Sequence, residues 1–178
     1  MFMKFLSWCL GVFVSAWAGQ YVLAFFLPNI IMEALYQRGG DANSYNSMVV
    51  APSPDETARS VVRPSPDLSY ASCIYNLGAG PLRIEAPVPE RYWSMQFYQM
   101  NTDNYGGITN QRDEQNRVGT IVNVTLIGPD SNPADYSGEV VQSPTQRGIV
   151  LLRSSNIGDD RESEDALVQS RCGPVVAG

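Results

Sequence analysis

The sequence predicts a mainly β protein: an antiparallel β-sandwich or open barrel, preceded by one N-terminal transmembrane helix and completed by a short C-terminal helix. Three observations lead to this class. Residues 5–27 form an apolar run without a charged side chain. Between residues 68 and 153, short segments of alternating polarity are separated by Gly and Pro turns, which is typical of antiparallel sheets. A helical pattern with acids near its start follows at Asp159–Cys172.

The amino-acid composition excludes several kinds of site. The 178 residues include no histidine, which is the usual general base near neutral pH and the commonest metal ligand. A standard Ser-His-Asp or Cys-His catalytic unit and a His-ligated zinc site therefore cannot be built from this chain alone. The 18 acidic residues outnumber the 12 basic ones, so the surface would repel a phosphate backbone, and nucleic acid is not an expected partner. We expect neither a bound metal nor a cofactor.

The apolar run Phe5–Leu27 predicts a membrane anchor. As a helix it would span about 34 Å at ~1.5 Å per residue, which is enough to cross the lipid hydrocarbon. Lys4 precedes the run, so the positive-inside rule places the N-terminus in the cytoplasm. A cleaved signal peptide is the alternative, because Ala16–Ala18 matches the A-x-A cleavage pattern. The run continues beyond that point, which favours an uncleaved, single-pass anchor in the cell membrane, and both interpretations place the rest of the chain in the periplasm or another extracytoplasmic space.

Small residues recur at every fourth position of this run. They are Ser7, Gly11, Ser15 and Gly19. A spacing of four keeps them near one face of a helix, where small side chains would let a second transmembrane helix approach closely. The alternative is that Gly and Ser are simply common in membrane helices.

Residues 29–60 are predicted to form a juxtamembrane helix and a linker. Asn29 would cap a short amphipathic helix that Gly39 ends. The chain from Gly39 to Ser60 is rich in Gly, Asn, Ser and Pro, which is typical of a linker, with one candidate strand at Ser47–Ala51. This divides the chain into an anchor (1–28), the juxtamembrane segment (29–60) and an extracytoplasmic β domain (61–178).

The β domain begins with two alternating segments. Residues 71–77 and 82–86 each alternate in polarity, and Gly78–Pro81 between them is a turn, so we expect the two strands to pair as a hairpin. Further strand patterns follow along the chain. They are Arg91–Met100, Arg117–Gly128, Gly138–Pro144 and Gln146–Ser154.

A succession of motifs in this domain resembles the family called domain of unknown function 1254. In order, the motifs are RPSPDLSYAS, LGAGP, RYWSMQFYQMNTDNY, IGPD and SPTQRGIVLLRS, between residues 61 and 153. The sequence departs from the family pattern at Ser65, Leu68, Ser69 and Gln99. The resemblance implies an all-β domain and, for short members, a membrane anchor, whereas longer members carry a second β domain of the 1214 type. It implies no established reaction, and it leads us to expect a protein partner that supplies the second β domain in trans.

Seven polar residues of this region are candidates for binding a ligand. They are Arg63, Asp67, Tyr70, Arg91, Tyr92, Gln96 and Asn104. The first four could form a pocket for a small anion or a carbohydrate, because arginine makes bidentate contacts with such groups. The alternative is structural: Asp67 caps a turn, Arg63 pairs with it, Tyr70 packs in the core, and the remaining polar groups satisfy irregular backbone.

Cys73 and Cys172 are the cysteines outside the apolar run. In an oxidising compartment they would form a disulfide that ties the C-terminal tail to a strand. Closing a loop of about 100 residues contributes roughly 4 kcal/mol on the chain-entropy argument.

Two functions are compatible with these patterns. The first is a membrane-anchored envelope protein that binds or scaffolds a partner. The second is a hydrolase or lyase acting on a small or carbohydrate substrate, which would depend on carboxylates, arginine and tyrosine because histidine is absent. A pocket shared by Asp67 and Arg91 would favour the enzyme, and their separation in a packed core would favour the scaffold.

Overall fold

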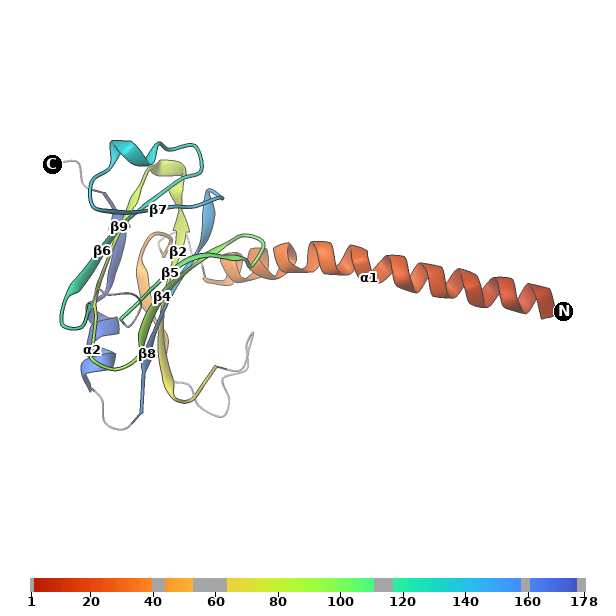
Figure 1. Ribbon diagram of the computed structural model, residues 1–178, viewed down its shortest axis with the longest axis horizontal. Coiled ribbons are helices and arrows are strands. Elements are labelled where there is room, and N and C mark those ends of the chain that lie inside the picture. The colour runs from red at the N-terminus through yellow and green to blue at the C-terminus, as the bar shows by residue number, and fades with distance from the viewer. Residues whose placement is uncertain (1, 40–43, 53–63, 111–116, 158–160, 176–178) are drawn as a thin grey trace.

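The computed structural model describes residues 2–39, 44–52, 64–110, 117–157 and 161–175. A long N-terminal helix, α1 (Phe2–Gly39), projects from a two-layered β domain, and a short helix, α2 (Arg161–Gln169), lies at the lower end of that domain in Figure 1. Two single turns of 3₁₀ helix, η1 (Leu77–Ala79) and η2 (Pro133–Asp135), lie between strands.

The nine described strands form two sheets, which confirms the predicted β-sandwich. The five-stranded sheet consists, in spatial order, of β1 (Met48–Val50), β2 (Leu68–Asn76), β8 (Arg147–Ser155), β4 (Trp93–Gln99) and β5 (Asn104–Thr109). The four-stranded sheet consists of β7 (Glu139–Gln142), β6 (Ile121–Ile127), β3 (Leu82–Pro87) and β9 (Arg171–Pro174). Neighbouring strands run antiparallel except for the parallel pair β6 and β7.

Alternate residues of both sheets fill one core between the layers. From the five-stranded sheet these include Cys73, Tyr75, Trp93, Met95, Phe97, Val150 and Leu152. From the four-stranded sheet they include Leu82, Ile84, Val122, Val124 and Leu126. Leu167 of α2 is fully buried against this core, so the amphipathic helix covers apolar surface that the sheets leave open.

The predicted hairpin of residues 71–77 and 82–86 is wrong, although both of its strands exist. β2 pairs with β1 and β8, whereas β3 pairs with β6 and β9 in the other sheet. The turn between them is the 3₁₀ turn η1 followed by Gly80 at φ 132°, a conformation that favours glycine. Both edges of β2 are occupied, so the turn carries the chain from one sheet to the other.

The predicted start of a separate helix at Asn29 is also wrong, because α1 continues through Pro28 to Gly39. A proline inside a helix removes one backbone hydrogen bond and is costly in water. Here the residues beyond it are held in place, since Met32 and Tyr36 are buried against the β domain. The helix ends at Gly39 as the sequence predicts.

The C-terminal region contains the predicted helix and one strand that the sequence did not indicate. α2 occupies Arg161–Gln169 within the predicted Asp159–Cys172, whose first two residues lie outside the described residues. The last residues of the predicted helix instead belong to β9, which pairs with β3 at the edge of the four-stranded sheet. The predicted strand at Ser47–Ala51 is confirmed as β1.

Candidate functional site: the joint between helix and β domain

The last turns of α1 pack against the start of β8 and form a joint, consisting of Met32, Glu33, Tyr36, Tyr45 and Arg147. Tyr36 is only 3% exposed and stacks on Tyr45, with ring centroids 4.8 Å apart. The guanidinium of Arg147 lies over the Tyr36 ring at 4.9 Å and makes a salt bridge with Glu33 at 3.3 Å. The joint therefore combines apolar burial, ring stacking and a cation–π contact, all centred on Tyr36. Side-chain packing therefore attaches α1 to the β domain, in addition to the covalent polypeptide connection.

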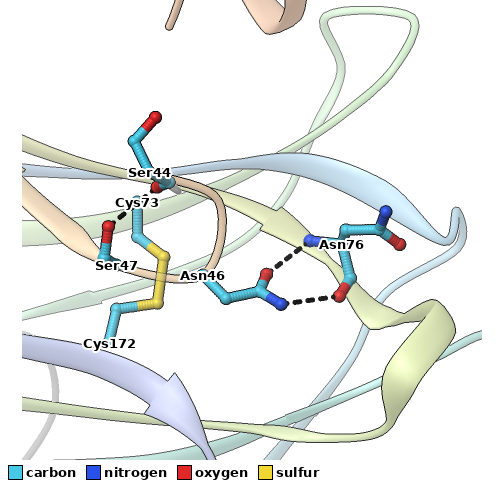
Figure 2. The surroundings of a disulfide bond; sticks show 6 residues. All are labelled: Ser44, Asn46, Ser47, Cys73, Asn76 and Cys172. Atoms are coloured by element: carbon cyan, nitrogen blue, oxygen red, sulfur yellow. Dashed lines mark hydrogen bonds between the residues drawn. A yellow bond between two sulfur atoms is a disulfide. The ribbon is translucent and has the colours of Figure 1, made fainter. Parts of the chain in front are cut away.

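A tight turn after α1 adds a second attachment. Asn46 has φ 60°, and its side chain binds the backbone of Asn76 twice (Figure 2): Asn46 Oδ1 accepts from the Asn76 N–H, and Asn46 Nδ2 donates to the Asn76 carbonyl at 3.0 Å. The backbone N–H of Asn46 also donates to the carbonyl of Ile74 at 2.9 Å. The amide thus replaces a strand partner at the end of β2 and leads the chain into β1.

The predicted disulfide between Cys73 and Cys172 is present, and Figure 2 shows it beside the Asn46 turn. Cys73 lies on β2 and Cys172 on β9, so the bond joins the two sheets, with Cα atoms 6.4 Å apart. Cys73 is completely buried. The bond fixes the short C-terminal strand to the sheet that also holds α1.

The predicted binding corner lies at the other end of the five-stranded sheet, away from the joint. Asp67 is exposed, and its backbone carbonyl accepts a hydrogen bond from the N–H of Asn156 at 2.7 Å. Arg91 is exposed, and its Nη1 donates to the carbonyl of Ile157 at 2.9 Å. The structure therefore brings Asp67 and Arg91 to the same end of the sheet, on opposite sides of β8. Arg63 lies outside the described residues, and ligand binding at this corner stays a prediction.

The other candidate binding residues make hydrogen bonds within the protein. Tyr70 Oη accepts from the backbone N–H of Ser65 at 2.9 Å, which fastens the chain that precedes β2. Tyr92 Oη lies 3.1 Å from a serine hydroxyl on β4. Gln96 Oε1 accepts from Asn104 Nδ2 at 2.6 Å, across the β4–β5 pair. These contacts have a structural purpose, and a ligand-binding role for the four residues stays a prediction.

A buried chain of hydroxyl groups was not indicated by the sequence. Tyr75 Oη lies 2.8 Å from Ser143 Oγ and 3.0 Å from Tyr105 Oη. Ser143 Oγ donates to the carbonyl of Thr145 at 2.6 Å, so its own proton is used. Tyr75 therefore donates to Ser143, with the carbonyl of Tyr98 at 3.4 Å as a second and more distant acceptor, and Tyr105 donates to Tyr75. Ser143 is fully buried, so its hydroxyl is not presented as a nucleophile. The buried hydroxyl chain instead stabilises the core beneath a surface hollow of about 310 Å³.

The two phenols of this chain predict a loss of stability at high pH. Burial raises the pKa of both Tyr75 and Tyr105 above the ordinary value of 10.0. Above pH ~10 the unfolded chain releases protons that the folded chain retains, so the free energy of unfolding falls as pH rises. We expect a titration followed at 295 nm to show a late ionisation phase that coincides with unfolding. The Tyr75→Phe/Tyr105→Phe variant should lose amplitude from that phase, and ionisation of every tyrosine in one step near pH 10 would contradict the prediction.

The fold and the joint define a class: a two-sheet β domain packed onto the end of a candidate membrane helix. α1 is long and apolar enough to cross a membrane, and its most apolar window is not buried by the rest of the protein. The chain belongs to the family described as protein of unknown function DUF1254, whose profile matches residues 45–171. This confirms the resemblance seen in the motifs. No curated protein matches the sequence.

Two solved structures have a similar fold. The VPA0106 protein from Vibrio parahaemolyticus has a TM-score of 0.62 at 14% identity over 87% of this chain, and an uncharacterized protein from Burkholderia cenocepacia has a TM-score of 0.53 at 15% identity over 88% of this chain. The matches cover 36% and 42% of those two chains, respectively. At these identities the likeness concerns the fold alone.

Proposed function

We propose that this chain is a single-pass envelope protein whose β domain binds a second protein close to the membrane. Its N-terminus would lie in the cytoplasm and its β domain in the periplasm or another extracytoplasmic space. The partner would supply, in trans, the 1214-type β domain that the family resemblance implies for longer members. The protein would then act as an anchored binding or scaffold module.

The joint carries this proposal. A flexible tether would need no stacked Tyr36 and no Arg147 salt bridge, whereas a module that must present one surface at a fixed height above a membrane would need both. The Cys73–Cys172 bond supports an oxidising, extracytoplasmic location.

Cross-linking and purification of the tagged full chain from its own membranes test this function. We expect mass spectrometry to identify a co-purified protein that contains a 1214-type β domain. Gly11→Ile should reduce recovery of the partner protein several-fold. A branched side chain on the small-residue face of α1 would keep a second transmembrane helix from approaching closely. Phe13→Ile, on the opposite face of α1, is the matched control and should leave recovery unchanged. Purification of this chain alone, or only with proteins that lack such a domain, would refute the proposal.

A further inference from the structure

A groove of about 520 Å³ lies where α2 meets the end of the sandwich, at the lower end of the domain in Figure 1. Three segments line this α2 groove: residues 87–89 at the end of β3, residues 119–121 that lead into β6, and one face of α2. Small-molecule sites occupy roughly 300–1,000 Å³, so the groove has the size of such a site. None of the candidate residues described above lines it.

Backbone hydrogen bonds and core packing hold the walls of the α2 groove in place. The N–H of Val88 donates to the carbonyl of Thr120, and the N–H of Gly119 donates to the carbonyl of Val88, each at 2.9 Å. On the other wall, Leu167 is fully buried in the core, and Ala166 beside it is nearly so. The groove is therefore formed by the fold itself and does not depend on a ligand to shape it.

The lining of the α2 groove combines apolar groups with two carboxylates. Pro87, Pro89 and Ile121 supply apolar surface, and Ile121 remains 68% exposed. Glu162 and Asp165 supply the carboxylates, three positions apart on α2. This spacing places them on one helix face, where two like charges repel each other. A cation in the groove would relieve that repulsion.

The chain supplies no cation for these two carboxylates. No basic residue lines the α2 groove. Within the described part of the chain, neither Glu162 nor Asp165 takes part in a salt bridge. Arg161 lies one turn before Asp165 on the helix without pairing with it, and Arg117, near the other wall, pairs with Glu139 at 2.8 Å. The negative charge of the groove is therefore left for a ligand.

The backbone of the α2 groove offers few hydrogen-bond donors. Pro87 and Pro89 have no N–H group, and the N–H groups of Val88, Gly119 and Thr120 all donate to backbone carbonyls. The Thr120 hydroxyl also donates to a backbone carbonyl, at 2.6 Å. A ligand in the groove therefore meets mainly acceptors. An ammonium group fits this arrangement, because it has three N–H donors and no acceptor.

We propose that the α2 groove binds a small aliphatic amine. Its ammonium group contacts Glu162 and Asp165, and its carbon chain lies against residues 87–89 and Ile121. The inference is independent of the proposed partner protein and of how the domain sits on a membrane. Acids early in a helix also stabilise it through the helix dipole, but that role requires neither an apolar wall nor a lack of donors beside them.

Three ligands with the same five-carbon chain test the inference: 1,5-diaminopentane, 1,5-pentanediol and glutarate. Each is titrated at low ionic strength into the full chain in neutral detergent micelles, and the isoleucine methyl resonances are followed by NMR. Ile121 reports the groove, and Ile157, which is 58% exposed outside it, is the reference. We expect only the diamine to shift the Ile121 resonance saturably, without moving that of Ile157. An equal response to the uncharged diol, or no saturable shift with the diamine, would overturn the proposal.

Charge-removing variants of α2 then locate the amine. Glu162→Gln/Asp165→Asn should weaken binding of the diamine about tenfold, because both charge contacts are lost. Glu164→Gln is the matched control: it removes a charge from the same helix outside the groove and should leave binding unchanged. Equal weakening by the control would mean that the diamine responds only to overall charge, which would refute the site. Resonances of buried isoleucines such as Ile84 report folding, and Glu162→Gln alone, with a several-fold loss expected, replaces a double variant that does not fold.

Discussion

The Cys73→Ala/Cys172→Ala variant is expected to lose about 4 kcal/mol of unfolding free energy. The bond closes a loop of 99 residues, for which the chain-entropy argument gives about 4.7 kcal/mol, whereas the typical contribution of a disulfide is about 2–4 kcal/mol. Total stabilities of single domains are about 5–15 kcal/mol, so the variant would be close to unfolding. The loss should concern the whole domain, because the bond connects β2 in one sheet with β9 in the other.

Urea unfolding of the full chain in detergent micelles measures this effect. Trp93 is the tryptophan outside α1, and it is fully buried, so its emission reports unfolding of the β domain. Trp8→Phe and Trp17→Phe remove the other two signals. Cys9→Ser is the matched control, since Cys9 is exposed on α1 and unpaired, and it should leave the midpoint unchanged. A double-alanine variant with the midpoint of this control would show that the bond contributes nothing to stability.

The sequence predicts the strands of this protein better than their partners. Alternation marks residues 71–77 and 82–86 as strands, because burial on one face acts on each strand separately. The pairing of β2 depends on β8, which lies about 80 residues farther along the chain, and no local pattern in the sequence indicates it. A turn that leads into a hairpin and a turn that leads to the opposite sheet use the same Gly and Pro residues.

The candidate site, too, could be predicted from the sequence only in part. The disulfide could be predicted because two cysteines outside an apolar run have few alternatives in an oxidising compartment. The joint could not, because Glu33 and Arg147 are 114 positions apart and a single salt bridge leaves no pattern in a sequence. Tyr36 does carry a weak signal: it follows Met32 at the spacing that places both on one face of a helix. Asp67 and Arg91 lie at the same end of the five-stranded sheet, beside strands that flank β8, and a binding site formed by them stays a prediction.

Gly148→Ala is expected to destabilise the β domain by about 3 kcal/mol, the upper end of the range for overpacked cores. Gly148 is buried in the interior of β8, opposite Tyr75 in the β2 register. A Cβ atom at this position would overlap the Tyr75 phenol and the backbone carbonyl of Tyr98. Backbone cannot retreat cheaply, and Tyr75 is held by its hydrogen bonds to Ser143 and Tyr105. Relief of the overlap therefore requires the buried hydroxyl chain to break.

The matched control is Gly173→Ala on β9, where a Cβ atom would meet nothing within 4 Å. This substitution should leave stability unchanged or raise it by up to about 1 kcal/mol, because it restricts the unfolded chain without a clash in the folded one. Urea unfolding followed by Trp93 fluorescence compares the two variants, and exchange of buried amide hydrogens should show faster opening of β8 in Gly148→Ala. Equal stability of the two variants would mean that β8 and Tyr75 shift apart at little cost, and that the hydroxyl chain does not fix their spacing.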